Sequence, residues 1–417
     1  MEGSMNITEC TECRICGNRN LHPVLDLGTQ ALTGIFPGPG ESVPTAPLEL
    51  VKCSPDGCGL VQLRHTADLS LMYGAHYGYR SGIRPYMINH LHGKVEKLTG
   101  MVGGLGPDDL VLDIGSNDAT LLRGYPANGP TLVGIDPTGE KWRSHYPDHI
   151  DLIPDFFSKA GFTERYGDRK ARIVTSIAMF YDLPDPTGFM ADVRDILTDD
   201  GVWLVEMSYL VSMLEVLAYD AVCHEHLEYY ALAQIEWMAE RVGLTVATAE
   251  VTPVNGGSLC LTLVKDPSRH TIDTAGIERI RRREAELELS TMAPYEDFAR
   301  RVRHHRDELR AFLEESRAAG RVTLGYGAST KGNVVLQYCG IDSRDLPCIG
   351  EVSPEKHGRL TPGTNIPIVS EEEAKALRPD QLLVLPWVHR EGFIEREPDF
   401  LAEGGRMVFP LPTISAV

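Results

Sequence analysis

The 417-residue sequence lacks any apolar run long enough to cross a bilayer. Its first residues, "MEGSMNITECTECRICG", lack the hydrophobic core of a secretory signal peptide. Basic charge is also scarce: 40 Lys and Arg stand against 59 Asp and Glu, which gives a formal net charge of −19. Because a surface of that sign repels a phosphate backbone, we expect no nucleic-acid partner. From the missing apolar run and signal peptide, we expect no membrane partner and a cytoplasmic location.

The composition is that of a folded globular chain, with 42% hydrophobic and 24% charged residues. A chain of this length exceeds one typical domain, so two or three domains are expected.

Cysteine is scarce after residue 60, because five of the nine cysteines precede it. Two turns carry pairs of them: "CRICGN" holds Cys13 and Cys16, and "VKCSPDGCGLVQL" holds Cys53 and Cys58. Turns rich in Gly, Pro, Asp and Asn suit knuckles that present two thiolates each to one ion. The pattern predicts a closed, structural zinc site, with Cys10 as a spare ligand.

The middle of the chain predicts a cofactor site but lacks the G-x-G-x-x-G that seats a pyrophosphate. "DDLVLDIGSNDATLLRGY" predicts a strand, a glycine turn at Gly115 and the start of a helix. "PTLVGIDPTGEKW" predicts a second strand that ends at Asp136, 21 residues after Gly115, where an acid takes a ribose diol. Both NAD and S-adenosylmethionine (SAM) are compatible with this pattern.

Three details favour SAM. The loop through Asn117 needs no close approach to phosphate, because SAM has none. Asp113 is placed to hold an ammonium group. "IPDFF" offers Asp155 and Phe156 to an adenine, while at least one of its two phenylalanines is expected in the core. Pro137, next to Asp136, completes the predicted cofactor site. Further strands at "ARIVTSIAMFYDL" and "GVWLVEMSYL", with helices between them, predict a mainly parallel sheet.

The C-terminal third begins with a long charged segment that predicts one or two helices. "RVTLGYGASTKGNVVLQYCG" then predicts a strand, a turn and a helix whose N-terminus, with Ser329 and Lys331, forms an anion site. It is no Walker loop, because the G-x-x-x-x-G-K spacing is absent. Arg359 and His389, on loops after later strands, are further candidates for substrate binding.

The stretch "YDAVCHEHLEYY" has three readings. As a metal site it is poor, because His224 and His226 are two residues apart and point in different directions. A role as part of the hydrophobic core is reasonable, since the tyrosines and the leucine of the stretch can pack and His224 is expected to be structural. As a proton-transfer site it suits a reaction that needs a base near neutral pH.

Six motifs occur together and in order: "CRICG…CSPDGC", "VLDIGSNDATLL", "DFF", "CHEHLEYY", "NGGS" and "GYGASTKGN". As a set they resemble the SAM-dependent sugar C-methyltransferases of deoxysugar biosynthesis, of the TDP-sugar C-3′-methyltransferase type. The resemblance covers essentially the whole chain. It implies an α/β protein with a zinc-binding domain, a Rossmann-like SAM domain and a C-terminal Rossmann-like domain. We place these at residues 1–75, 76–270 and 271–417, the last including a helical linker.

The resemblance also implies a reaction: methylation of a nucleotide-linked 4-keto deoxysugar on the carbon next to the ketone. It gives His226 the role of base, with Glu225 beside it and Tyr77 and Tyr79 as candidate donors to the enolate. Asp182 and Cys223 differ from the family pattern, which has histidine and tyrosine there, and both are expected to line the sugar site.

Asn255 and Gly256 in "VNGGS" are expected beside the sugar, although a plain hairpin turn explains them as well. Rival functions are an O- or N-methyltransferase on a sugar, a nicotinamide-dependent sugar reductase and a zinc-knuckle nucleic-acid binder. We expect a monomer or a weak homodimer.

Overall fold

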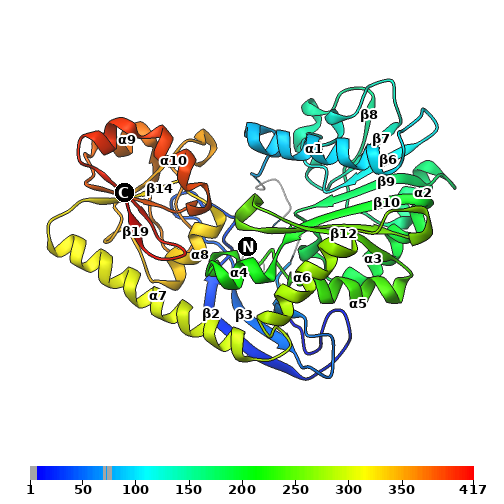
Figure 1. The fold of residues 1–417 in the computed structure, drawn as a ribbon. Coiled ribbons are helices and arrows are strands. Elements are labelled where there is room, and N and C mark those ends of the chain that lie inside the picture. Colours follow the sequence, from blue (N-terminus) through cyan, green and yellow to red (C-terminus); the bar gives the residue numbers. More distant parts are fainter. Residues whose placement is uncertain (1–6, 69–71, 73–77) are drawn as a thin grey trace.

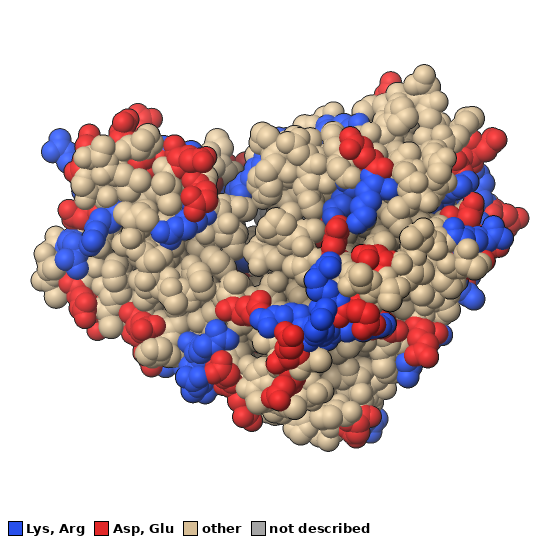
Figure 2. Space-filling view, viewed as in Figure 1, with Lys and Arg blue, Asp and Glu red and all other residues tan. Residues whose placement is uncertain are grey.

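The computed structural model describes residues 7–68, 72 and 78–417. Three parts follow one another along the chain, each built around a sheet (Figure 1). The middle and C-terminal parts lie side by side, and the N-terminal sheet lies below and between them in this view. Figure 2 shows acidic and basic side chains interspersed over the same face, with a hollow between the middle and C-terminal parts.

The N-terminal sheet is antiparallel and has the order β11-β4-β3-β2. Its own strands are β2 (Leu21–Ala31), β3 (Thr45–Cys53) and β4 (Val61–Leu63), and a short pair, β1 (Thr8–Glu9) and β5 (His65–Thr66), lies beside them. The outer strand β11 (Glu228–Tyr229) comes from the middle part. Two residues of the stretch "YDAVCHEHLEYY" are therefore built into the N-terminal sheet.

The middle part holds a seven-stranded sheet of order β12-β13-β10-β9-β6-β7-β8. Strands from β8 to β10 run parallel, and β13 runs antiparallel to both of its neighbours, which confirms a mainly parallel sheet. The strands are β6 (Leu110–Ile114), β7 (Thr131–Ile135), β8 (Ile150–Ile153), β9 (Ala171–Ile177), β10 (Leu197–Ser208), β12 (Thr245–Thr252) and β13 (Ser258–Val264). The helices are α1 (Pro85–Met101), α2 (Lys159–Tyr166), α3 (Pro186–Ile196), α4 (Leu210–Glu215) and α5 (Leu232–Val242).

The prediction of an α-helix after Gly115 is wrong. Only a 3₁₀ turn forms there, η3 (Leu122–Gly124). Asn117 and Ala119 have φ values of 50° and 60°, in the left-handed region that interrupts a right-handed helix. Pro126 then disfavours helical geometry at the residue before it. The apolar residues between these two breaks are too few for an α-helix.

Two helices, α6 (Thr274–Glu286) and α7 (Ala293–Ala318), connect the middle and C-terminal parts, as the sequence predicts. α6 begins at Asp273, whose side chain accepts a hydrogen bond from the Gly276 N–H, and it packs along β12. α7 buries an apolar stripe at helical spacing against the rest of the chain, formed by Phe298, Val302, Leu309 and Leu313.

The C-terminal part holds a six-stranded sheet of order β16-β15-β14-β17-β18-β19, parallel except for its last strand. Its strands are β14 (Thr323–Tyr326), β15 (Ile349–Glu351), β16 (Ile368–Ser370), β17 (Gln381–Val384), β18 (Arg406–Phe409) and β19 (Ser415–Ala416). Its helices are α8 (Thr330–Tyr338), α9 (Glu371–Ala376), α10 (Arg390–Arg396) and α11 (Pro398–Ala402). The parallel order with helical crossovers is Rossmann-like, as the family resemblance implies.

We propose domain boundaries near residues 75 and 270, which give each sheet to one part apart from β11. Among the helices in the described ranges, none has both the length and the apolar character that crossing a bilayer requires.

Candidate active site

The four predicted zinc ligands converge, although Cys53 ends β3 and the other three lie in turns. The Sγ atoms of Cys13 and Cys58 are 3.4 Å apart, those of Cys16 and Cys53 are 3.5 Å apart, and all four lie within 4.8 Å of one another. Four sulfurs held about 2.3 Å from one zinc ion in a tetrahedron are spaced about 3.8 Å apart, so the cluster fits zinc. The Cys10 Sγ instead donates to the Glu12 carbonyl, outside the cluster.

The predicted cofactor residues gather at the carboxyl ends of β6 and β7. Asp136 is buried, and its Oδ2 accepts a hydrogen bond from the Asn117 N–H at 2.8 Å. Its Oδ1 accepts from the N–H and the hydroxyl of Thr138, both at 2.6 Å. Because a carboxylate offers about four acceptor positions, roughly one remains for a cofactor hydroxyl. Asp136 therefore holds the glycine loop in shape, and its contact with the cofactor stays a prediction.

Asp113 and Gly115 shape the same edge. Asp113 is buried and accepts a hydrogen bond from the Thr175 hydroxyl at 2.6 Å. Burial raises its pKa to about 7, an effect that an ammonium group placed beside it opposes. Gly115 has a φ of 76°, and a Cβ there would lie 3.0 Å from Met179 Cγ.

The remaining predicted cofactor residues are more open. Phe156 is 54% exposed, whereas Phe157 packs edge-on against Phe189 with ring centroids 5.1 Å apart. One of the two phenylalanines thus belongs to the core and the other presents a free ring face. Asp155 is exposed and accepts a hydrogen bond from the Phe156 N–H, while Pro137 directly follows Asp136 and is half-buried.

We predict that Asp136→Ala raises the Kd for SAM by roughly 10- to 100-fold. The change removes a charge-assisted hydrogen bond to the cofactor and releases the Asn117 amide, together about 1.5–3 kcal/mol. Calorimetric titration measures the effect, and nucleotide binding should stay nearly intact. Asp155→Ala, on an exposed loop, is the comparison with the smaller expected effect. Unchanged SAM affinity in Asp136→Ala would reject the assignment.

The stretch from Tyr219 to His226 is held by all three parts of the chain. The Tyr219 hydroxyl contacts His305 Nδ1 on α7 at 3.1 Å, and His305 Nε2 contacts the Pro410 carbonyl at 2.6 Å. Trp387 Nε1 donates to Asp220 Oδ2 at 2.7 Å, so the C-terminal part reaches this stretch at a second point.

His224 faces the N-terminal part. Its Nε2 donates to the Ala46 carbonyl at 3.0 Å, and its ring is buried. Burial lowers its pKa to about 4. This placement agrees with the structural role expected for His224. Because Nε2 carries the proton that it donates to Ala46, this nitrogen has no lone pair to accept another.

His226 lies in the same stretch and has one ring nitrogen held by the backbone. Its Nδ1 lies 2.8 Å from the Ala221 carbonyl, which only accepts hydrogen bonds, so Nδ1 carries the proton and Nε2 keeps a lone pair. The Tyr181 ring packs edge-on against the imidazole, with centroids 4.5 Å apart. Burial and the nearby Lys331 charge lower the His226 pKa to about 3, which keeps the imidazole neutral near pH 7.

Lys331 is the residue that the structure adds to this group. It lies near the start of α8, which packs against η6 (Tyr219–Ala221). Its positive charge lowers the pKa of His226 and opposes the burial that raises the pKa of Asp220 and Cys223. Within the described residues Lys331 forms no hydrogen bond or ion pair. The turn that carries Lys331 and the stretch that carries His226 therefore lie next to each other.

Three further predicted residues lie in or near this stretch: Cys223, Glu225 and Asp182. Cys223 is buried, and burial raises its pKa well above its ordinary value, so the thiol is neutral. Burial also raises the pKa of Glu225. Asp182 is half-buried and close enough to Cys223 for its charge to raise the thiol pKa further.

Three other predicted residues meet in a groove of about 220 Å³ between the middle and C-terminal parts. Asn255 and Gly256, from the turn between β12 and β13, face His389, whose ring lies 6.0 Å from that of Tyr86. Gly256 has a φ of 88°, and a Cβ there would lie 3.3 Å from Val388. The turn is a hairpin turn between β12 and β13 and also lines the groove. Its place beside the sugar stays a prediction.

Some predicted residues have structural partners instead. The Ser329 hydroxyl caps α8 by accepting from the Gly332 N–H, and Arg359 donates to the carbonyls of Phe36 and Glu355. The Tyr79 carbonyl accepts from Asn117 Nδ2, which places this residue beside the cofactor loop. Tyr77 lies outside the described residues.

Sequence reasoning missed Glu351, which repeats the Asp136 arrangement in the C-terminal sheet. Glu351 ends β15, and its carboxylate accepts from the N–H groups of Ala328 and Ser353 at 2.8 and 2.9 Å. It follows Gly327 by 24 residues, so the same spacing rule that selects Asp136 also selects it. No such spacing marks three other residues near the predicted site, because only the folding of distant segments places them there: Asp220, Trp387 and Tyr86.

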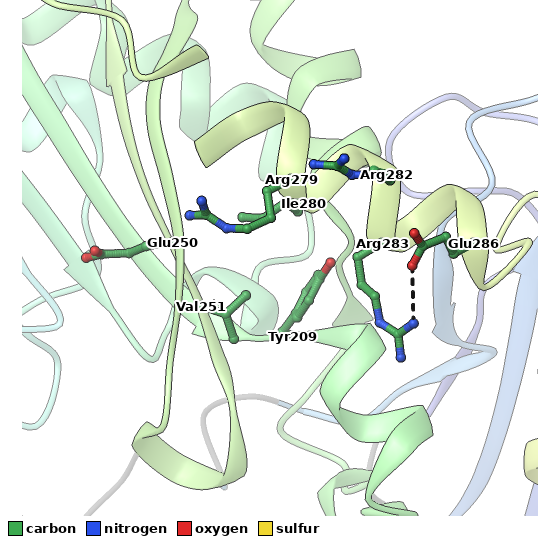
Figure 3. Close-up of a pocket in the computed structure, with 8 residues that line it drawn as sticks. All are labelled: Tyr209, Glu250, Val251, Arg279, Ile280, Arg282, Arg283 and Glu286. Carbon is green, nitrogen blue, oxygen red and sulfur yellow. Dashed lines mark hydrogen bonds and ion pairs between the residues drawn. The ribbon is translucent and has the colours of Figure 1, made fainter. Parts of the chain in front are cut away.

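A larger groove of about 620 Å³ lies between β12 and α6, apart from the predicted residues (Figure 3). Its lining has mixed charge. Three arginines and two glutamates lie around Tyr209 and Val251: Arg279, Arg282, Arg283, Glu250 and Glu286. Arg283 pairs with Glu286 across one end. The Tyr209 N–H donates to the Gly257 carbonyl, so this groove and the "VNGGS" turn share one support.

A seven-stranded sheet of this order, with an acid-anchored loop at its carboxyl edge, is that of a SAM-dependent methyltransferase. Family models agree in chain order: zinc binding domain over residues 13–73, methyltransferase domain over 89–249, and C-methyltransferase C-terminal domain over 253–412. C-methyltransferase NovU of Streptomyces niveus is 30% identical over 412 residues, which span 96% of this chain and 95% of NovU. The chain belongs to the C-methyltransferase family.

The resemblance seen in the sequence is thus confirmed, with SAM and zinc as the cofactors. Among solved structures, the CcbJ methyltransferase of Streptomyces caelestis overlaps 45% of this chain and 92% of its own, at 12% identity and a TM-score of 0.34. Magnesium protoporphyrin IX methyltransferase of Synechocystis overlaps 46% and 91%, at 14% identity and a TM-score of 0.34. The family assignment does not rest on these partial overlaps.

Proposed function

We propose that the protein methylates a nucleotide-linked 4-keto deoxysugar on the carbon next to the ketone. The observation that carries the proposal is the closeness of His226 to Lys331, whose charge lowers the pKa of the imidazole. A neutral imidazole with a free Nε2 lies near an unpaired ammonium group, at the junction of the cofactor-binding and C-terminal parts. A keto sugar with a diphosphate presents one acidic C–H and one anionic group, which this pair can address together.

The proposed chemistry begins at His226 Nε2, which accepts the proton from the carbon next to the ketone. The proton held on Nδ1 by the Ala221 carbonyl keeps the imidazole in the tautomer that leaves Nε2 free. The enolate oxygen needs a hydrogen-bond donor, and we assign Tyr77 or Tyr79 to it. SAM supplies the methyl group to the enolate carbon when it is bound.

Lys331 has two roles in this proposal. Its ammonium binds the substrate diphosphate at the start of α8, with the β14–α8 turn and Glu351 supporting the nucleotide. A bound anion also offsets the charge that lowers the His226 pKa, so the imidazole becomes a stronger base once substrate is present. The sugar is placed at the groove of Asn255, Gly256 and His389, with Cys223 and Asp182 near the base. We further propose that the protein acts in the cytoplasm as a monomer or weak homodimer.

We predict that Lys331→Ala raises the KM for the nucleotide sugar by roughly 10-fold or more, since a charge-assisted hydrogen bond contributes about 1.5–3 kcal/mol. The variant should also flatten the salt dependence of KM, because one ion pair is removed. Steady-state kinetics at two ionic strengths measure both effects. Lys375→Ala, whose ammonium pairs with Glu397 elsewhere in the C-terminal part, is the matched control. If the nucleotide affinity does not move, the turn only caps a helix.

The proposed function is tested by incubation with SAM and a panel of 4-keto nucleotide sugars. A mass increase of one methyl group, together with loss of the C–H proton next to the ketone, supports it. Methyl transfer to oxygen or nitrogen, without deuterium exchange at that carbon, would replace it with the rival methyltransferase classes.

A further inference from the structure

One segment of the N-terminal part, residues 31–37, lies against both the middle and the C-terminal parts. The segment is tied to α8 at two points. Ala31 and the Gln337 side chain exchange two hydrogen bonds, at 2.8 and 3.2 Å. Asn333 Nδ2 donates to the Thr33 carbonyl at 2.8 Å, and Asn333 is fully buried. Both partners lie on α8, the helix whose first turn carries Lys331.

The far end of the segment is tied to the loop after β15. Arg359 Nη1 donates to the Phe36 carbonyl at 3.0 Å, and the Leu360 N–H donates to the Pro37 carbonyl at 2.8 Å. The Lys356 ammonium lies 4.7 Å from the centre of the Phe36 ring. The segment is therefore fixed along its length by backbone hydrogen bonds, which side-chain changes within it leave in place.

The middle of this fixed segment touches the catalytic stretch. A Cβ built on Gly34 would lie 2.7 Å from Glu225 Oε1, closer than real contacts allow. The other carboxylate oxygen, Oε2, is buried and has no hydrogen-bond partner among the described residues. Burial raises the pKa of this carboxyl group, and the neighbouring Cys223 and Thr33 side chains oppose that rise. The Gly34 backbone therefore forms one wall of the space that the carboxylate occupies, with Cys223 and Thr33 as its other neighbours.

We propose that Gly34 is a positioning residue: its bare Cα leaves the space in which the Glu225 carboxylate is held, next to Cys223 and on the same stretch as His226. The N-terminal part then forms one wall of the reaction site, in addition to binding zinc. This inference rests on the proposed function, in which Glu225 acts next to the base.

Gly34→Ala tests the inference directly. Gly34 is absent from the described residues with positive φ, so alanine adopts the same backbone without strain. The new Cβ meets the end of a flexible side chain, so the fold should persist with a melting temperature within a few degrees of wild type. The Glu225 carboxylate should move, and kcat should fall roughly 10- to 100-fold with SAM affinity unchanged.

Two comparisons make the result specific. Gly93→Ala, on α1 with no atom within 4 Å of the added Cβ, should keep wild-type kcat. Gly34→Ala/Glu225→Gln should be no slower than Glu225→Gln alone, because both changes remove the same positioned carboxylate. A full additive loss in the double variant would mean that Gly34 acts through another group.

A crystal structure of the Gly34→Ala variant reads the carboxylate position without any substrate. An unmoved Glu225, or a displaced Glu225 with unchanged kcat, overturns the inference. If the wild type transfers no methyl group to keto sugars, the proposed function fails while the displacement is still measured. If Gly34→Ala yields no folded protein, Gly34→Ala/Glu225→Ala must restore folding, and continued misfolding overturns the inference.

Discussion

Replacing His226 by asparagine should lower kcat by roughly 10²–10⁴-fold while SAM binding stays intact. Asparagine can keep the donor to the Ala221 carbonyl, so the local backbone has its partner, but it offers no basic nitrogen where Nε2 stood. The loss then falls on the chemical step. Calorimetric titration with SAM and steady-state kinetics with a keto nucleotide sugar separate binding from turnover.

The neighbouring histidine gives the matched control. His224→Asn breaks the buried contact with the Ala46 carbonyl and should cost about 1–3 kcal/mol of stability. Its folded fraction should turn over at a rate close to wild type. Equal loss of kcat in both variants would mean that the stretch merely unfolds, and that neither imidazole is the base.

The pH dependence has a defined sign. A base is active above its own pKa, and the His226 pKa in the free protein is about 3. The kcat/KM profile, which reports free enzyme, should therefore show no loss from His226 between pH 7 and 5. In the substrate complex an anion beside Lys331 raises that pKa, so any acid limb in kcat should lie at higher pH than the one in kcat/KM. An acid limb at the same pH in both profiles contradicts the coupling.

Exchange of the sugar C–H with deuterated solvent, in the absence of SAM, isolates proton transfer from methyl transfer. Wild type should incorporate deuterium next to the ketone, and His226→Asn should not. If the variant exchanges at the wild-type rate, the base lies elsewhere, and Asp182 or a tyrosine becomes the first candidate.

The sequence predicts what local spacing controls. Cys13 and Cys16 can face one ion because only two residues separate them, and Asp136 meets the Gly115 loop because neighbouring parallel strands end at one edge. Glu351 obeys the same rule. These features need only the chain's local geometry and the order of its strands.

The missing parts depend on packing between distant segments. Lys331 stands 105 residues after His226, and only the packing of α8 against η6 brings its charge to the imidazole. Gly34 carries no sequence signal, because its importance comes from a carboxylate almost 200 residues away. The wrong prediction of a helix after Gly115 has a local cause instead. The apolar spacing there favours a helix, but the left-handed backbone at Asn117 and Ala119 prevents it.

Cys16→Ser should abolish stoichiometric zinc and unfold or greatly loosen the N-terminal part, a loss of roughly several kcal/mol. Structural zinc contributes about 10–16 kcal/mol of apparent binding free energy in small zinc-binding peptides, and that binding energy is folding energy. Here the four sulfurs lie within 4.8 Å of one another, so one ion joins the two cysteine pairs. Without the ion, like-charged thiolates at this spacing repel each other.

Cys10→Ser is the matched control, because the Cys10 Sγ contacts the Glu12 carbonyl and lies outside the cluster. It should keep one zinc per chain and wild-type melting behaviour. Zinc content by elemental analysis and melting curves with and without a chelator read both variants. A Cys16→Ser protein with full zinc and normal melting would show that the ligand assignment is wrong. Because β11 of the middle part pairs with β4, loss of zinc should also loosen the stretch that carries His226, so kcat should fall in Cys16→Ser even though no ligand touches the reaction site.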